Sequence, residues 1–367
     1  GGTPSRSNAS YYKGEIPWIT TVSLTGGIIG TADAIEFITE QAIKESAAKI
    51  VPAYSIMVGT RVGVGKVAIN SVPMSTSQDI ISLLSIDEAK WDKEFLCKFI
   101  IGKSPYLNSQ ARGATIKGIK IETLANLEVP DISLDEQKHI AHVLNEVNTQ
   151  LHLRTSQLEE LDKLVKSRFI ELFGSIPDSE HTTMTDVCSI ITDGTHQPPK
   201  FTSSGIPFLF VSNIVTNKIT YKTEKHISEE TYAELIKRTP IEIGDILLST
   251  VGSYGHPAVV ETDERFCFQR HIAYLKPKND VVNSRYLYGV LLSADVQKQI
   301  DEKVKGIAQK TLNLSEIKKL HFPLPPMELQ NEFAAFVEHT DKLKLAVTEA
   351  LTELETLKKS LMQQYFG

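Results

Sequence analysis

Two stretches of the chain begin alike: residues 130–144 read PDISLDEQKHIAHVL, and residues 323–337 read PLPPMELQNEFAAFV. Each begins with a proline and has a glutamine seven positions later, at Gln137 and Gln330. Beyond these glutamines, neither stretch contains another proline or glycine until a closing glycine 37 residues further on. Long segments without these two residues predict uninterrupted helices. The fold is therefore expected to contain two long and similar helices.

The two stretches belong to a longer internal repeat. Gly113 aligns with Gly306, and the match continues without a gap for 62 residues at a constant offset of 193. It ends at Phe-Gly in both halves, at residues 173–174 and 366–367. A repeat of this length indicates that one structural unit is used twice.

Upstream of this match the two halves differ more but keep the same order of features. Ile-Pro-Trp at residues 16–18 resembles Ile-Pro-Phe at 206–208, and the glycine-rich run at 59–65 resembles the run at 249–255. A further match is Gly2-Thr3 with Gly194-Thr195. Each half thus has a variable region followed by a similar region, as expected if one scaffold carries two different recognition surfaces.

The first long helix is predicted over residues 133–174. Its apolar residues recur at alternating steps of three and four, which is typical of a coiled-coil seam. Ser133 and Glu136 form a capping box at its start, and Gly174 ends it. A helix of about 38 residues is about 57 Å long. One row of the seam is Leu144, Leu151, Leu158, Val165 and Leu172, and the second is Ile140, Val147 and Leu161, interrupted by Arg154 and Arg168.

The second long helix is predicted over residues 326–367, after Pro325. Neither helix can bury its apolar row on a small domain, so we expect the two to pack together. The two-fold relation of the repeat predicts that they are antiparallel. The alternative is a pair of solvated amphipathic helices that serve oligomerisation. The predicted seam of the second helix is Phe336, Leu343, Val347, Leu354, Leu357 and Leu361.

In the two variable regions, short β-rich runs alternate with Gly, Ser, Thr and Pro turns. Predicted strands are 16–22, 49–58, 66–69, 208–211, 245–249 and 271–275, and predicted helices are 93–101 and 284–303. Each region is expected to form a mixed α/β domain on a mostly antiparallel sheet. The predicted class is α+β, with two repeated mixed α/β domains and two long antiparallel coiled-coil helices related by a pseudo-two-fold axis. The predicted domains are 1–132, 133–174, 175–325 and 326–367.

The net charge of the 367-residue chain is −6, which is unusual for a protein that binds DNA. Residues 133–174 carry −2 and residues 326–367 carry −3, so the variable regions and the segments beside them carry only −1. The acidity therefore lies mainly in the predicted helices. A nearly neutral remainder can still concentrate positive charge on one face. This removes an objection to DNA binding without being evidence for it.

The variable regions contain the residue types that read and hold DNA. Arg and Lys contact guanine and Asn and Gln contact adenine in the major groove, while Ser, Thr, Lys and glycine-rich backbone hold phosphates. The alternative for each residue is a solvated side chain or a turn. Candidates in the first region are Ser5, Arg6, Thr60, Arg61, Lys66, Ser77, Gln78, Arg112 and Lys117. Candidates in the second are His196, Gln197, Lys200, Asn213, Thr250, Ser253, Tyr254, His256, Gln269, Arg270, Lys305 and Lys310.

Several signatures of other protein classes are missing. No run of about 18 apolar residues predicts a transmembrane helix, and residues 1–4 do not resemble a signal peptide. The three cysteines share no close spacing, which argues against disulfides or a zinc site and suits a reducing cytosol. The run Gly59–Lys66 is not a phosphate-binding loop, because Val67 follows the lysine instead of Ser or Thr. Glu136 and Lys138 imitate a nuclease site that the repeat does not share. We therefore expect no catalytic and no metal site.

Taken in order, these features resemble the specificity subunit of type I restriction-modification systems. The resemblance rests on the duplication, the Ile-Pro-aromatic motifs, the glycine-rich turns, the Pro…Gln helix starts and the Phe-Gly helix ends. It covers essentially the whole chain, although no single motif is diagnostic. One departure is a lead-in at residues 181–192, which has no counterpart before Gly2-Thr3.

The resemblance implies two target-recognition domains, each reading one half of a split double-stranded DNA site. It also implies that the long helices set the separation of these domains and dock two methyltransferase subunits, which use S-adenosylmethionine to methylate adenine. A restriction subunit would add cleavage that requires ATP and Mg²⁺. The chain itself would be a cytoplasmic, non-catalytic subunit without a cofactor or a membrane partner.

Three alternatives stay open at this point. The closest alternative, within the same class, is the recognition subunit of a related two-subunit system that cuts on both sides of its site. The chain would otherwise be a coiled-coil scaffold that binds no DNA, or an enzyme whose motif is not visible in the sequence.

Overall fold

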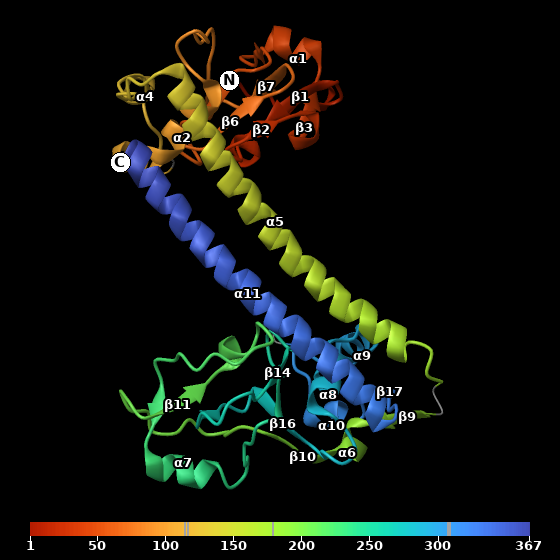
Figure 1. The fold of residues 1–367 in the computed structure, drawn as a ribbon. Helices are drawn as coiled ribbons and strands as arrows, with labels where there is room; N and C mark the ends of the chain where they lie inside the picture. Colours follow the sequence, from red (N-terminus) through yellow and green to blue (C-terminus); the bar gives the residue numbers. More distant parts are fainter. Residues whose placement is uncertain (114, 116, 178–179, 307–309) are drawn as a thin grey trace. The chain divides into compact units, whose positions relative to one another are not determined.

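The computed structural model describes residues 1–367 except 114, 116, 178–179 and 307–309, and it contains two compact units (Figure 1). Unit 1 comprises Gly1–Thr155 and Glu349–Gly367, and unit 2 comprises Ser156–Thr348. Helices α5 (Leu134–Phe173) and α11 (Met327–Phe366) each begin in one unit and end in the other. Each unit thus combines one variable region with the start of one long helix and the end of the other.

Unit 1 contains two four-stranded sheets, in the orders β3-β1-β7-β4 and β2-β6-β5-β8. The strands are β1 (Ile16–Ile19), β2 (Ile28–Ile29), β3 (Glu36–Ile38), β4 (Ile50–Val51), β5 (Ile56–Gly59), β6 (Val67–Asn70), β7 (Met74–Thr76) and β8 (Ile80–Leu83). The helices besides the long ones are α1 (Glu40–Glu45), α2 (Lys93–Gly102), α3 (Ser104–Gln110) and α4 (Ile121–Ala125).

Unit 2 contains sheets in the orders β10-β16-β13-β14, β12-β11-β15 and β17-β9. The strands are β9 (His181–Thr183), β10 (Cys188–Asp193), β11 (Ile206–Leu209), β12 (His226–Ile227), β13 (Ile246–Ser249), β14 (Pro257–Val259), β15 (Cys267–Phe268), β16 (Ile272–Pro277) and β17 (His321–Pro323). The helices are α6 (Met184–Val187), α7 (Glu229–Leu235), α8 (Ser284–Leu292), α9 (Ala294–Lys303) and α10 (Leu314–Ile317).

The two variable regions share a topology, which confirms the predicted duplication and the α+β class. Strand β1 pairs antiparallel with β3 and parallel with β7, and β11 pairs in the same way with β12 and β15. Strand β5 lies between β6 and β8, as β13 lies between β14 and β16. Among the described strands most pairs are antiparallel, as predicted. The lead-in adds β10 along the outer side of β16, whereas the equivalent strand β8 is the edge of its described sheet.

Three predicted elements are shorter than the sequence indicated. The strand predicted at 49–58 is divided into β4 and β5, because Pro52 and the left-handed backbone of Tyr54 (φ 60°) interrupt it. The helix predicted at 284–303 is divided into α8 and α9 at Ser293, whose extended backbone and side chain cap α9. The strand predicted at 16–22 ends at Ile19, because Thr20 caps a 3₁₀ turn.

The predicted seam of α5 is confirmed, but that of α11 is partly wrong. Leu343 and Leu357 are 43% and 46% exposed, while Phe333 and Val337 are buried and were not predicted to be. The inward row of α11 is 330, 333, 337, 340, 344, 347, 351, 354, 358, 361 and 365, which repeats the 4-3 spacing of α5 at the offset of 193. The correct frame therefore contains polar residues, including the buried Thr340, at positions where α5 has apolar ones.

The long helices are antiparallel, as two ion pairs of unit 2 demonstrate. Arg168 lies 2.5 Å from Glu332, and Asp162 lies 2.6 Å from Lys344. As the residue number rises in α5, the number of its partner in α11 falls. In unit 1, the start of α5 and the end of α11 contribute to one hydrophobic core.

Two buried glutamines attach the start of each long helix to the neighbouring domain. Gln137 accepts a hydrogen bond from the backbone N of Asp92 at 2.9 Å, and Gln330 accepts one from Asn283 N at 2.9 Å. Asp92 and Asn283 are the N-caps of α2 and α8. Each glutamine amide also donates to backbone carbonyls, so neither is left with an unsatisfied polar group. The Pro…Gln motif is thus a structural joint.

The Phe-Gly ends anchor the other end of each helix. Phe366 is buried in unit 1, with its ring 5.6 Å from that of Phe95 in α2. Phe173 is buried in unit 2, with its ring 4.9 Å from that of Tyr286 in α8. Both contacts fall on the first turn of the helix whose N-cap residue is hydrogen-bonded to the glutamine. The motifs used to identify the repeat are therefore the residues that build the joint.

Candidate nucleic-acid interface

The glycine-rich runs form the same tight turn in both units. Gly65 N donates to Gly59 O at 3.0 Å, and Gly255 N donates to Ser249 O at 2.9 Å. Gly65 and Gly255 have φ of 80° and 79°, a backbone region that residues with a Cβ rarely adopt. The turns follow β5 and β13, so equivalent strands present them.

Each turn is fastened to two other segments of its unit. Thr60 N donates to Asp79 O at 2.8 Å, and Ile119 N donates to Thr60 O at 2.9 Å. Thr250 forms the corresponding two bonds at 3.0 and 2.8 Å. These bonds use the main chain, while the side chains of Thr60 and Thr250 are buried. Thr60 and Thr250 therefore fix the backbone of the turn. Because their side chains are buried, the structure gives no support to the predicted contacts of these side chains with DNA.

A basic segment lies beside each turn. Arg112 and Gly118 exchange two backbone hydrogen bonds of 2.9 and 3.0 Å, and Lys305 and Thr311 exchange two of 3.1 and 2.8 Å. Gly118 also bridges to Arg61, and Thr311 bridges to Val251. Consequently Arg112 in unit 1 and Lys305 in unit 2 are held next to the turn by the main chain. The predicted residues Lys117 and Lys310 directly precede Gly118 and Thr311.

The segments that contain the other predicted residues also lie near the two glycine-rich turns. In unit 1, Ser77 N donates to Ile19 O at 2.9 Å and leads to Asp79, which contacts the turn. In unit 2, Arg270 N donates to Thr195 O at 3.0 Å, just before His271. The segments brought together are 60–61, 77–79, 112 and 117–119 in unit 1, and 194–195, 250–251, 269–271, 305 and 310–312 in unit 2. Most of the candidates chosen from the sequence belong to these two groups.

In unit 2 the turn carries polar and aromatic side chains that unit 1 lacks. The hydroxyl of Tyr254 donates to Asp301 at 3.0 Å, and the Lys310 ammonium lies 5.8 Å from the Tyr254 ring. Ser253 is exposed and His256 is partly exposed on the same turn. Burial, and then the neighbouring Arg270, lower the pKa of His271, so its imidazole is neutral near pH 7.

Three cationic candidates lie apart from the turn. Arg6 forms a 2.6 Å ion pair with Glu36 and stacks on Tyr12 at 4.3 Å, so its charge is already balanced; exposed Ser5 lies beside it. His196 Nε2 lies 2.9 Å from Asp193, which also binds Arg238. The exposed Gln197 and Lys200 follow His196. Sequence reasoning missed Arg238, which binds the same Asp193 as His196 but is distant from both in the sequence and has no local motif.

Two predicted DNA contacts are better explained as structural residues. Asn213 is buried, and its amide donates to the carbonyls of Thr220 and Lys222 at 2.7 and 3.1 Å. Ser77 is 3% exposed, and its hydroxyl accepts from the backbone N of Asp79 at 3.4 Å. Gln78, Arg61 and Lys66 are the accessible candidates of unit 1 near the turn, together with Arg112 and Lys117.

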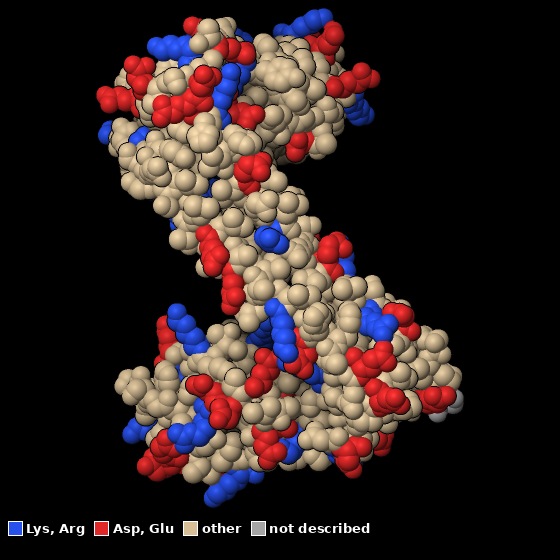
Figure 2. All heavy atoms as spheres, in the orientation of Figure 1, with Lys and Arg blue, Asp and Glu red and all other residues tan. Residues whose placement is uncertain are grey.

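Charge of both signs is distributed over the face of each unit that Figure 2 shows, with Lys and Arg beside Asp and Glu. Within the described residues, no group of three or more His, Cys, Asp and Glu is arranged to hold a metal ion. None of the described helices is long and apolar enough to cross a membrane.

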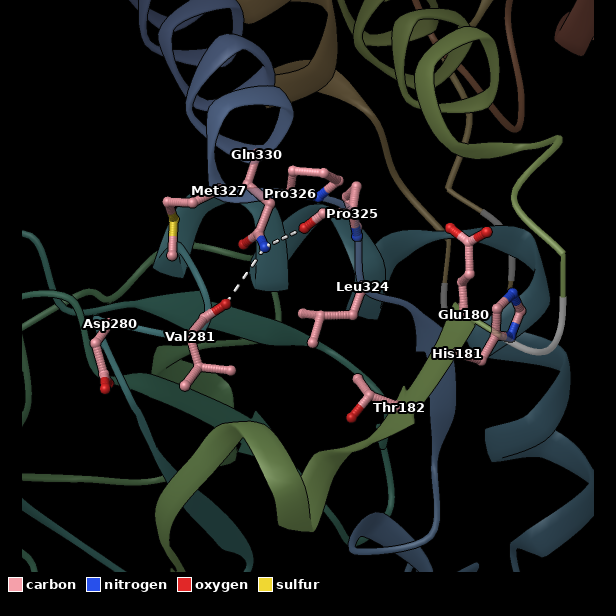
Figure 3. Close-up of a pocket in the computed structure, with 10 residues that line it drawn as sticks. All are labelled: Glu180, His181, Thr182, Asp280, Val281, Leu324, Pro325, Pro326, Met327 and Gln330. Carbon is pink, nitrogen blue, oxygen red and sulfur yellow. Dashed lines mark hydrogen bonds between the residues drawn. The ribbon is translucent and has the colours of Figure 1, made fainter.

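A pocket in unit 2 lies at the start of α11, as Figure 3 shows. Its walls come from Glu180–Thr182, from Asp280 and Val281, from the residues 324–326 that precede α11, and from the first turn of α11. Gln330 points across it and donates to Val281 O and Pro325 O at 3.3 and 2.8 Å. Since Gln137 forms the same kind of bonds in unit 1, we interpret the pocket as part of the helix joint.

The chain matches the family model described as the type I restriction modification DNA specificity domain over residues 1–163 and 178–358. The MjaIX type I restriction enzyme specificity subunit of Methanocaldococcus jannaschii is 26% identical over 363 residues, covering 92% of this chain and 83% of that protein. The EcoBI specificity subunit of Escherichia coli is 23% identical over 397 residues, covering 98% of this chain and 77% of that protein.

Solved structures resemble the fold along nearly its whole length. The crystal structure of a type I restriction-modification S subunit from M. genitalium aligns with a TM-score of 0.59 at 16% identity, covering 100% of this chain and 92% of that one. A chain from a structure on complex assembly and conformational transition of the type I R-M system aligns with a TM-score of 0.61 at 18% identity, covering 96% and 91%. At these identities the likeness supports the fold.

Proposed function

Because the chain belongs to the type I restriction-modification DNA specificity family, we propose that its two units recognise the two halves of a bipartite, gapped DNA site. The chain supplies DNA sequence recognition. Catalysis in the proposed complex belongs to partner subunits: methyltransferase subunits that bind S-adenosylmethionine and methylate adenine, and restriction subunits that use ATP and Mg²⁺. We place this assembly in the cytoplasm.

The observation that carries the proposal is that one backbone arrangement presents different side chains in the two units. Arg61 of unit 1 corresponds to Val251 of unit 2, and Lys66 corresponds to His256. The β7–β8 connection presents Ser77-Gln78, whereas the equivalent connection presents Gln269-Arg270. Different donors and acceptors select different base edges. The two half-sites are therefore expected to differ in sequence.

The long helices fix how far apart the half-sites lie. Each has 40 residues, so each is about 60 Å long when straight. At 3.4 Å per base pair this sets an upper limit of about 18 base pairs, and tilt of the helices reduces it. A separation of about one turn of DNA between half-site centres is compatible with this limit.

Repeat-related exposed leucines support two equivalent docking sites on the helices. Leu164 of α5 and Leu357 of α11 occupy the same repeat position and are 49% and 46% exposed. Exposed apolar residues on both members of a duplicated pair favour a partner that binds twice, once at each position. We propose that this partner is the methyltransferase subunit.

Methylation mapping tests the proposal. The chain is purified with the methyltransferase subunits of its host and incubated with unmethylated genomic DNA and S-adenosylmethionine, and modified adenines are mapped by single-molecule sequencing. We expect one asymmetric motif with a fixed gap and one modified adenine in each half. The matched control omits the chain, and should give no motif. Methylation that is independent of the chain, or a motif without a gap, would contradict the proposal.

The same preparation separates the alternatives. A two-subunit system of the related kind would cut both sides of the mapped motif when Mg²⁺ is added. A scaffold without DNA affinity would give no salt-dependent binding of a duplex that carries the motif.

A further inference from the structure

Two repeat positions carry an exposed cation in both units, which gives four cations in all. Arg112 corresponds to Lys305, and Lys117 corresponds to Lys310, at the offset of 193 that relates the long helices. On the basis of the proposed function, we infer that these two pairs grip the phosphate backbone of the two half-sites and do not read bases. The class of ligand is the sugar-phosphate backbone of duplex DNA, bound independently of its sequence.

The main chain holds these cations in fixed and equivalent places. Arg112 and Lys305 each exchange two backbone hydrogen bonds with the residue that follows Lys117 or Lys310. In unit 2 a third bond, from Gly252 N to Lys310 O at 3.1 Å, joins the segment to the glycine-rich turn. Both units also have a bridge at this place, between Arg61 and Gly118 in unit 1 and between Val251 and Thr311 in unit 2. A backbone fixed in this way positions its side chains without using them.

The charges of these side chains are not neutralised by the fold, although the Lys310 ammonium lies 5.8 Å from the Tyr254 ring. All four cations are exposed, and within the described part of the chain none of them forms an ion pair. Other basic residues behave differently: Arg6 pairs with Glu36, and Arg265 makes two 2.8 Å hydrogen bonds to Glu229. A structural role therefore explains the backbone of the shared segments but leaves the positive charges unexplained.

The substitution pattern shows which property of the side chains is common to both units. Arg112 is replaced by Lys305, which keeps the charge but loses the planar fork that binds the guanine edge in two places. The neighbouring cations Arg61 and Lys66 are replaced by Val251 and His256, so they differ between the units. Half-sites of different sequence have only the backbone in common. Residues that keep their charge in both units therefore suit contacts with phosphates, which both half-sites share. Residues that change between the units suit contacts with bases, which differ.

Binding measurements on the whole complex test this inference. The double variants R112A/K117A and K305A/K310A are each assembled with the methyltransferase subunits. Their affinity is measured for a duplex with the mapped motif and for an unrelated duplex of equal length, across a range of salt concentrations. R112K/K117R and K305R/K310R are matched controls that keep the charge. R61A is the comparison for a base-reading residue.

We expect each double alanine variant to lose affinity for both duplexes by the same factor. The slope of log affinity against log salt should fall by up to about two, since each phosphate contact contributes about 0.9. The methylated motif should be unchanged, and the charge-keeping variants should bind like the wild type. R61A should weaken binding of the motif duplex only.

Two results would overturn the inference: unchanged affinity for the unrelated duplex, or a relaxed motif in the half-site of the altered unit. Thermal unfolding of each variant checks that the exposed substitutions leave the fold intact. If the wild-type complex bound neither duplex, the proposed function would fail instead, so the two failures are distinguishable.

Discussion

Shortening both long helices by one heptad should shorten the gap in the DNA site. Residues 152–158 and 345–351 are repeat equivalents near the middle of α5 and α11. Their deletion leaves the Asp162–Lys344 and Arg168–Glu332 ion pairs in place. Seven residues are one full period of the 3-4 seam, so every buried position keeps its register. The deletion therefore changes length with little change in packing.

The expected shift follows from helix geometry. Seven residues remove about 10.5 Å of helix, which equals about three base pairs of DNA. They also complete almost two helical turns, so the domains keep their orientation about the helix axis to about 20°. Three base pairs turn the duplex by roughly 100°, since one turn takes about 10.5 base pairs. The shortened protein should therefore prefer a gap two or three base pairs smaller and bind it more weakly than the wild type binds its own site.

Methylation mapping of a library with every gap length measures this shift. The matched control replaces the same two heptads by seven residues each with identical buried positions, and its gap should be unchanged. A shortened protein that methylates both original half-sites at the original gap would refute the idea that the helices set the distance.

Three further outcomes concern stability and chemistry. Phe366→Ala should lower the free energy of unfolding by about 3–5 kcal/mol in urea denaturation, because its ring is buried beside Phe95; a loss below 1 kcal/mol would contradict the proposed joint. Val337→Ala should cost about 2 kcal/mol and Leu343→Ala under about 0.5 kcal/mol, and the reverse order would disprove the corrected seam. Burial raises the pKa of Cys97 to about 12, so a thiol reagent at pH 8 should modify it slowly until denaturant is added; rapid labelling of the native protein would show that the site opens.

The buried row of α11 could have been predicted from the sequence by using the internal repeat. In α5 the inward positions 147 and 151 are Val and Leu, but the equivalent positions of α11 are Thr340 and Lys344. An apolar pattern read from α11 alone therefore favours Leu343 and Leu357, which are exposed. Transferring the frame of α5 through the repeat would have given the correct row. Duplication was a stronger signal than local hydrophobicity.

The pairing of strands could not be predicted in the same way. In unit 1, β1 at residues 16–19 pairs with β7 at 74–76 and with β3 at 36–38. These strands are three or four residues long and their partners are distant in sequence, so no local period identifies them. The division of α8 and α9 is a local effect that the apolar pattern did not reveal, because Ser293 has an extended backbone and its side chain caps α9.

Four of the predicted DNA contacts were chosen for their residue type, and the structure shows that their side chains are buried. Thr60, Ser77, Asn213 and Thr250 are all at most 7% exposed. Small polar residues serve turns and interiors as readily as they serve DNA, and one sequence does not distinguish these uses. Arg238 was not among the predicted residues, because only the fold places it beside Asp193.

Burial distinguishes two roles among the residues that the internal repeat keeps in both halves. A residue kept in both halves and buried, such as Gln137 with Gln330, satisfies backbone groups that every copy of the joint must satisfy. A positive charge kept at an exposed repeat position, without an ion pair in the described part of the chain, has no such internal reason, and Arg112 with Lys305 is of this kind. On the proposed function, the reason for keeping this charge lies outside the protein, in a feature that both half-sites share. On the proposed function, the net charge of −6 is no obstacle, because cations beside each turn can orient an anionic duplex while the excess acid lies on the long helices.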